Sequence, residues 1–170
     1  MPSSNPVQIP IIIKIIREHK PGSVLDIGTG YGKYGFLVRE YVDRFDRKVT
    51  LEGIEPAPRN LRVLAEVYDK LYMQAFLSDW ERQKEFSGRY ELGMMIDVLE
   101  HFDKAQGFEA LDKALYYCKR LLIATPKEPA PQTGTWEAHR SKWNKLDMHY
   151  VGNWHDYSTD HTLIGILTKK

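Results

Sequence analysis

The sequence contains very little cysteine. Cys118 is the single cysteine among 170 residues, so no disulfide can form within the chain, and a zinc site built from several cysteines is excluded. A chain without disulfides suits a reducing compartment, and we therefore expect a cytoplasmic protein.

An excess of charge of either sign is also missing. The chain has 24 basic and 23 acidic residues, which give a formal net charge of +1. This balance provides no broad electrostatic field that would attract a nucleic-acid backbone or an anionic membrane surface. We therefore expect neither nucleic acid nor a membrane as a partner.

Long hydrophobic runs are absent as well. The longest one near the start extends from Ile9 to Ile16, but Pro10 and Lys14 interrupt it, and a bilayer span needs roughly 20 apolar residues. The run has no basic leader and no small-residue cleavage site, so no export signal is predicted. The length is sufficient for one buried core and too short for two full domains, which predicts a single domain over residues 1–170.

The sequence does contain an alternation of apolar strand patterns with helical stripes. Strands are expected at 24–27, 49–54, 71–77, 92–96 and 121–124, with a closing antiparallel pair at 154–157 and 162–167. Apolar residues recur at helical spacing in 10–18, 36–45, 61–68 and 108–118, and a short helix is expected at 141–146. The first of these helices belongs to an N-terminal covering segment, 1–20, and Pro58 and Asn60 are expected to open the third. This alternation predicts an α/β fold with a mostly parallel sheet and helices on both faces.

The stretch from Val24 to Gly32 is the most informative part of the chain. A short strand pattern runs directly into Gly28-Thr29-Gly30-Tyr31-Gly32, with a glycine at every second position. Such a loop lets the backbone bend sharply and approach a ligand closely. In parallel sheets ligands bind beyond the carboxyl ends of the strands, so this loop predicts a cofactor site.

Two cofactor classes fit a glycine loop at this place. A dinucleotide oxidoreductase needs Gly-x-Gly-x-x-Gly from the end of the strand, and in that register Lys33 occupies the third glycine position. Gly30, Gly32 and Gly35 do match the pattern, but they start two residues too late. An NAD-dependent oxidoreductase would also usually require a second domain, so we retain it only as an alternative.

Five segments in the right order resemble the class I (Rossmann-like) S-adenosylmethionine-dependent methyltransferases of the small-molecule type. They are 24–32 as the first motif, 53–56 with the second-strand acid, Asp79 after the third strand, 90–101 with Leu-Glu-His, and 122–126 as the fifth. Glu91 departs from the pattern, which more often has Asp. The resemblance implies a single-domain methyltransferase fold, with a seven-stranded sheet whose last strand is antiparallel, and S-adenosylmethionine as the cofactor.

The residues expected at the cofactor suit its chemistry. Glycine amides can receive the methionine carboxylate, Asp26 can hold the ammonium directly or through water, and Glu55 can accept both ribose hydroxyls. Asp79, or Ser78 beside it, is expected at the adenine amine. The full predicted cofactor set is Asp26, Gly28, Thr29, Gly30, Tyr31, Gly32, Glu55, Pro56, Ser78, Asp79, Asp97 and Val98.

The acceptor side is predicted from the fourth motif and from a substrate-side loop region, 126–150. His101 and His139 are the candidate bases, needed only if the acceptor must lose a proton early. The expected substrate contacts are Glu100, Trp136, Glu137, Arg140 and Trp143, because aromatic walls with a few polar groups suit a small-molecule pocket. A metal site from His101, Asp103 and His139 has no supporting ligand spacing, so no metal is predicted.

The expected acceptor is a small molecule, or a reactive group at the end of a larger glycan or natural product, methylated on oxygen or nitrogen. A module that binds S-adenosylmethionine without transferring its methyl group, and serves as a partner protein, is the other alternative.

Overall fold

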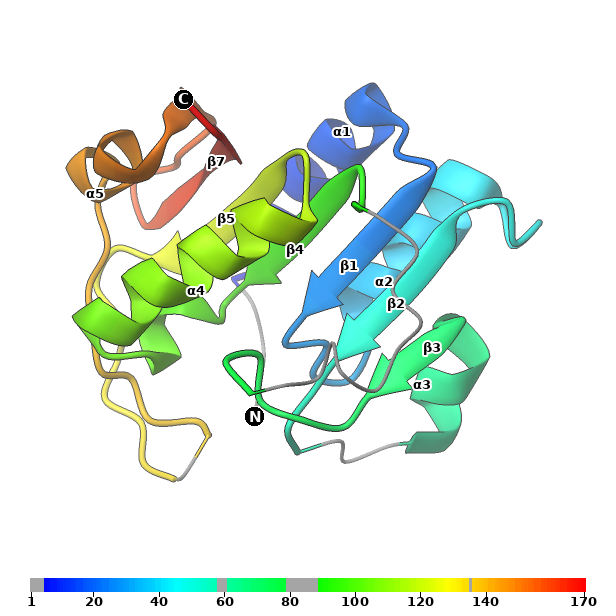
Figure 1. Ribbon diagram of the computed structural model, residues 1–170, viewed down its shortest axis with the longest axis horizontal. Helices are drawn as coiled ribbons and strands as arrows, with labels where there is room; N and C mark the ends of the chain where they lie inside the picture. The colour runs from blue at the N-terminus through cyan, green and yellow to red at the C-terminus, as the bar shows by residue number, and fades with distance from the viewer. Residues whose placement is uncertain (1–4, 58–60, 79–88, 135) are drawn as a thin grey trace.

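The computed structural model describes residues 5–57, 61–78, 89–134 and 136–170. Its seven strands are β1 (Ser23–Ile27), β2 (Thr50–Ile54), β3 (Lys70–Tyr72), β4 (Leu92–Ile96), β5 (Leu121–Pro126), β6 (Asn153–Asp156) and β7 (Thr162–Thr168). They form one sheet in the order β3-β2-β1-β4-β5-β7-β6 (Figure 1). Pairing is parallel from β3 through β5, while β7 is antiparallel to both of its neighbours. The predicted seven-stranded sheet with an antiparallel last strand is confirmed.

Helices cover both faces of the sheet, as predicted. They are α1 (Gln8–His19), α2 (Lys33–Val38), the π-helix η1 (Arg39–Asp43), α3 (Leu61–Val67), the short 3-10 helix η3 (Leu99–His101), α4 (Lys104–Tyr117) and α5 (Lys145–Val151). Figure 1 shows α4 in front of the sheet and α1 and α2 behind it. Each face has its own apolar core, with Leu111 and Met148 in one and Ile12 and Leu64 in the other. No helix in the described part of the chain is both long and apolar enough to cross a membrane.

The third strand is shorter than the sequence pattern predicts. The expected strand 71–77 ends at Tyr72, because the chain then turns, with the Ser78 amide donating to the Ala75 carbonyl at 3.0 Å. Phe76 is buried within this turn. Its apolar character arises from packing in a loop, which a period-two pattern cannot distinguish from a strand.

Two helix boundaries also differ from the prediction. The short helix expected at 141–146 is instead α5, which begins after Asn144 because that side chain accepts from the amides of Leu146 and Asp147 in a capping box. Helix α1 starts at Gln8, so Pro10 lies inside its first turn, where a missing amide costs nothing. Pro58 and Asn60, expected to open α3, lie outside the described residues.

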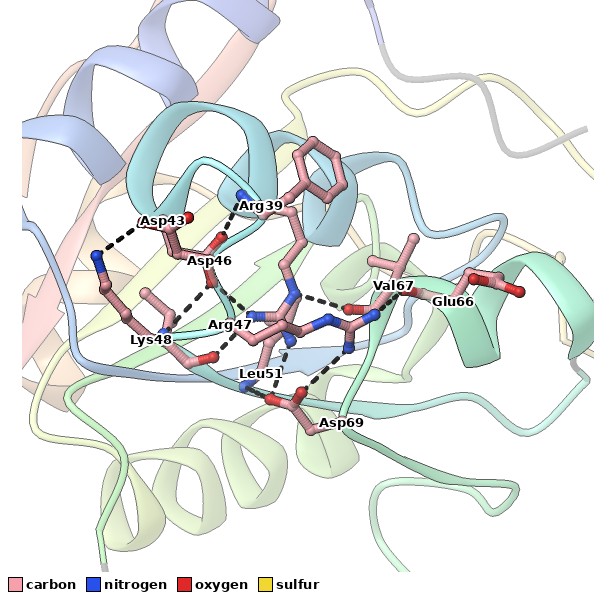
Figure 2. Close-up of polar contacts among 11 residues, drawn as sticks. Arg39, Asp43, Asp46, Arg47, Lys48, Leu51, Glu66, Val67 and Asp69 are labelled. Carbon is pink, nitrogen blue, oxygen red and sulfur yellow. Dashed lines mark hydrogen bonds and ion pairs between the residues drawn. The ribbon is translucent and has the colours of Figure 1, made fainter.

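A buried ion cluster fixes the edge of the fold away from the carboxyl ends of the strands. Figure 2 shows Arg39 reaching from η1 toward the start of β2 and the end of α3. Its guanidinium donates to the carbonyls of Val67 at 2.8 Å and Val49 at 2.7 Å, and it pairs with Asp43 at 2.7 Å and Asp69 at 2.9 Å. Because Arg39 is fully buried, these partners offset the cost of burying its charge.

Candidate functional site

A cavity of about 780 Å³ opens at the carboxyl ends of β1, β2 and β4. Strand order reverses between β1 and β4, which is where ligands bind in open α/β sheets. The volume lies within the range of small-molecule sites. Its wall includes these predicted residues: Gly28, Gly30, Tyr31, Glu55, Pro56, Asp97, Val98, His101, Trp136, Glu137 and Arg140.

The glycine loop folds back over the end of β2. The amides of Gly28 and Thr29 both donate to the Ile54 carbonyl, at 2.8 and 3.2 Å. Gly28 has a φ of +77°, and a Cβ placed there would lie 2.4 Å from Cγ2 of Val98. Only glycine meets both demands, so the loop presents bare backbone to the cavity.

Glu55 is the polar group that joins the loop to the end of β2. Its Oε2 accepts from the Gly30 amide at 2.8 Å, and its Oε1 accepts from the Ala57 amide at 2.9 Å. A carboxylate oxygen has two acceptor positions, so each oxygen retains capacity toward a ligand hydroxyl. Glu55 lines the cavity, and its predicted contact with ribose hydroxyls stays a prediction.

Some residues of the predicted cofactor set lie beneath the loop instead of on the described cavity wall. Asp26 is buried, and its carboxylate accepts a hydrogen bond from the Tyr68 hydroxyl. Burial raises the pKa of Asp26 to about 7. Thr29 is buried as well, and Gly32 precedes α2 as its N-cap. These three residues support the loop, and Asp26 is not on the described cavity wall.

Sequence reasoning missed Gln8, which connects α1 to the cavity. Its Nε2 donates to Oδ2 of Asp97 at 2.9 Å and to the Tyr34 hydroxyl at 3.2 Å. Among the described residues its buried Oε1 has no hydrogen-bond partner. Asp97 itself adopts a left-handed φ of +53°, a backbone strain typical of functional sites. The sequence signal that could have identified Gln8 is its place in the first turn of α1, four residues before Ile12 on the stripe that packs against the sheet.

On the acceptor side, the loop after β5 is anchored to η3. The amides of Arg140 and Ser141 donate to the Glu100 carbonyl at 2.7 and 3.2 Å, and the Arg140 guanidinium donates to the His101 carbonyl at 2.6 Å. These bonds place Trp136 and Glu137 on the cavity wall. Phe102, Asp103 and Gln106, which follow η3, complete this side, although none was predicted as a substrate contact.

The two candidate bases lie next to each other. The ring centroids of His101 and His139 are 5.0 Å apart, but only His101 is on the described cavity wall. Burial lowers the pKa of His101, which favours its neutral form. Glu100 is buried beside them and accepts from the Thr125 hydroxyl at 2.9 Å, and burial raises its pKa to about 8.

Two predicted residues are placed elsewhere, and a third is not described. Trp143 is buried in the core, where its indole donates to the Leu99 carbonyl at 3.1 Å and packs edge-on against Phe108. The Ser78 hydroxyl donates to the Ala75 carbonyl at 2.6 Å, while its neighbour Leu77 reaches the cavity. Asp79 lies outside the described residues.

The sequence matches no protein-family model and no curated protein. Solved structures do share its fold. An O-methyltransferase family protein from Burkholderia thailandensis aligns with a TM-score of 0.66 and 17% identity, over 96% of this chain and 57% of that chain. TehB from Haemophilus influenzae aligns with a TM-score of 0.65 and 12% identity, over 95% of this chain and 62% of that chain.

A third solved structure is magnesium protoporphyrin IX methyltransferase from Synechocystis PCC 6803 with bound S-adenosylmethionine. It aligns with a TM-score of 0.59 and 14% identity, over 95% of this chain and 77% of that chain. The chain spans a little over half the length of the Burkholderia protein. Together with the strand order, these likenesses show that the chain has the fold of class I (Rossmann-like) methyltransferases.

Proposed function

We propose that this protein transfers the methyl group of S-adenosylmethionine to an oxygen or nitrogen of a small molecule, or of a terminal group on a glycan or natural product. The observation that carries the proposal is Glu55, which directly follows β2 and lies on the cavity wall while bonded to the Gly30 amide. A carboxylate beside an open glycine loop suits a ligand that carries both a diol and a carboxylate.

The described cavity wall offers polar groups to the methionine and ribose parts of the proposed cofactor. The amides of Gly28 and Gly30 already donate to Ile54 and Glu55, so these glycines give the methionine part room beside the loop, and Glu55 suits the ribose hydroxyls. Asp97, steadied by Gln8, offers a carboxylate to the ammonium or to the acceptor. The solved Synechocystis enzyme, which binds S-adenosylmethionine in the same fold, supports this assignment.

Methyl transfer requires alignment more than it requires a chemical helper. The sulfonium already activates the methyl carbon, so the protein aligns donor and acceptor and excludes water. The loop that carries Trp136 and Arg140 covers the acceptor side. His101 and His139 are the groups proposed to handle the proton of a hydroxyl or amine acceptor.

The other two interpretations make different predictions. A binding module without activity would take up the cofactor yet give no S-adenosylhomocysteine with any acceptor. A nicotinamide-dependent oxidoreductase would be stabilised by NAD. The position of Lys33 in α2, where a dinucleotide loop needs glycine, weighs against the second of these.

A thermal-shift experiment tests the proposal. At a ligand concentration about a hundredfold above Kd, S-adenosylmethionine and S-adenosylhomocysteine should each stabilise the fold by about 2.7 kcal/mol, a rise of about 5–10 °C in Tm. NAD at the same concentration should leave Tm unchanged. If neither S-adenosyl compound raises Tm at millimolar concentration, the proposed function is wrong. Release of S-adenosylhomocysteine in an acceptor panel then separates enzyme from binding module.

A further inference from the structure

Glu100, His101 and His139 gather one carboxylate and two imidazoles at the acceptor side of the cavity. One ligand atom from each residue lies within 4.8 Å of the other two. The two imidazole rings are tilted by 48° with centroids 5.0 Å apart, so they do not stack face to face. Glu100 and His101 belong to η3, while His139 belongs to the loop after β5, so tertiary structure alone brings them together.

The hydrogen bonds around this cluster orient its rings. Nδ1 of His101 lies 3.3 Å from the Ala138 carbonyl oxygen, and Nδ1 of His139 is bonded to the Ala130 carbonyl oxygen. A carbonyl can only accept, so these contacts favour the neutral tautomer of each ring that carries its proton on Nδ1 and keeps a lone pair on Nε2. This is the arrangement found around histidines that bind metals, whose other ring nitrogen donates to a carbonyl or carboxylate.

Glu100 is held in a similar way. Its side chain is buried, and its Oε2 accepts from the Thr125 hydroxyl at 2.9 Å. The amides of Arg140 and Ser141, which follow His139, donate to the Glu100 carbonyl. Carboxylate and imidazole therefore sit on segments that are already bonded to each other.

We propose that Glu100, His101 and His139 bind a divalent transition-metal ion. Two imidazoles with one carboxylate are the ligand set of zinc and its first-row neighbours, whereas calcium and magnesium prefer oxygen alone. Bonds of about 2.1 Å to one ion hold ligand atoms about 3.0–3.5 Å apart. The ligand atoms are at most 4.8 Å apart, so they must approach one another by about 1.5 Å to hold an ion. Side-chain rotation of His139 on its loop can provide this movement.

The role of the ion rests on the proposed function, although its binding does not. His101 is on the cavity wall, so an ion beside it faces the acceptor. An acceptor hydroxyl bound to the ion loses its proton to solvent more easily. Its oxygen then forms a bond to the methyl carbon as the carbon–sulfur bond breaks, and that electron pair stays on sulfur. In this arrangement the two imidazoles serve as metal ligands instead of free bases.

The test is a metal titration of the untagged full chain after treatment with a chelator. Calorimetry with Zn²⁺ should show one ion bound per chain with a micromolar or lower Kd, and Co²⁺ should give visible absorption bands typical of nitrogen and oxygen ligands. His139→Ala and Glu100→Gln should each weaken Zn²⁺ binding at least tenfold. His149→Ala, which changes an exposed histidine on α5, is the matched control and should bind as the wild type does.

Two results would overturn the metal site. One is a wild-type chain that binds no Zn²⁺ or Co²⁺ at 100 µM, a concentration about a hundredfold above a micromolar Kd. The other is His139→Ala with unchanged affinity, a result that decides the matter even if Glu100→Gln fails to fold. S-adenosylhomocysteine titrated into the same samples separates the two proposals. If the chain binds metal but not S-adenosylhomocysteine, only the proposed function is refuted. If it binds S-adenosylhomocysteine but no metal, only the metal site is refuted.

Discussion

The two sides of the cavity are built differently. On the cofactor side, the glycine loop and Glu55 belong to short segments that directly follow β1 and β2, and backbone amides fix them in place. On the acceptor side, the loop that carries Trp136 and Arg140 is held by bonds to η3, which is distant in the sequence. The first side is set by the turns that follow two adjacent strands, whose contact joins residues 25 apart in the sequence, and the second by a loop held to η3 by a contact between residues 39 apart.

This difference predicts how each side responds to substitution. Where backbone forms the wall, even one added methyl group is costly because the loop has no room to adjust. Where exposed side chains on a loop form the wall, a substitution should change what binds without disturbing the fold. The following predictions test that contrast, from the largest expected effect to the smallest.

Gly28→Ala should be the most disruptive change. The left-handed φ of +77° and the 2.4 Å approach to Val98 together should lower the free energy of unfolding by about 3 kcal/mol. Urea denaturation measures the loss. Adding Val98→Ala to Gly28→Ala should recover only the part of the lost stability that comes from the clash with Val98, because the strain of the left-handed φ remains. Val98→Ala alone is the control. A fully stable Gly28→Ala would show that the cofactor-side backbone is adaptable, contrary to the comparison.

Glu55→Ala should lower the affinity for S-adenosylhomocysteine about a hundredfold, which corresponds to about 2.7 kcal/mol. The variant loses the proposed diol contact and the bond that fixes the Gly30 amide. Calorimetry gives the affinity, and circular dichroism should show a retained fold. Glu40→Ala, on the exposed face of η1, should bind normally. Unchanged affinity in Glu55→Ala would remove the main support for the proposed cofactor.

Asp26→Asn should alter how stability depends on pH. Burial raises the folded-state pKa of Asp26 to about 7 from 3.8, so the folded chain binds more protons between these values. This contribution therefore makes stability fall as pH rises from 4 to 7, by about 3 kcal/mol. An asparagine side chain cannot ionise, so the variant should gain stability relative to wild type at pH 8 compared with pH 5.

Denaturation of the ligand-free protein at both pH values measures this difference. A difference between Asp26→Asn and wild type that does not change with pH would mean that the Asp26 carboxyl titrates normally. The Tyr68 hydroxyl, which donates to Asp26, would then stabilise the ionised form enough to cancel the effect of burial.

Trp136→Ala should have the smallest effect and should act on the other ligand. This half-exposed side chain lines the acceptor side, so KM for the best acceptor should rise about tenfold, or about 1.4 kcal/mol. Affinity for S-adenosylhomocysteine should change less than twofold, and Trp136→Phe should retain most of the wild-type KM. An equal loss of cofactor affinity would show that the two sides are not independent.

Most of the cofactor side could be predicted because its signals are local. The expected strand 92–96 is identical to β4, and β1 and β2 differ from their predicted bounds by one residue. Gly28 and Glu55 lie where a glycine loop and a strand-ending acid predict them to lie. A strand that runs into a glycine turn places its next residues at the carboxyl end of the sheet, where the Ile54 carbonyl then holds the turn.

The acceptor side was less predictable because residues of the same kind take different places. Trp136 and Trp143 are both tryptophans in the same loop region, yet one lines the cavity and the other is buried against Phe108. Composition alone does not separate a binding wall from a core anchor. The difference comes from the capping of α5 by Asn144 and from the bonds that Trp143 makes to η3.

The sequence by itself indicated the α/β alternation, the strands and the glycine loop at the end of β1 through short-range patterns, and its resemblance to the methyltransferases implied one seven-stranded sheet. Tertiary structure alone decided that Gln8 reaches Asp97 and that Glu100, His101 and His139 meet. These contacts join segments that are far apart in the sequence, and no local pattern predicts which side chains will meet. The cofactor loop can therefore be recognised from consecutive residues, whereas the acceptor side is formed only by folding.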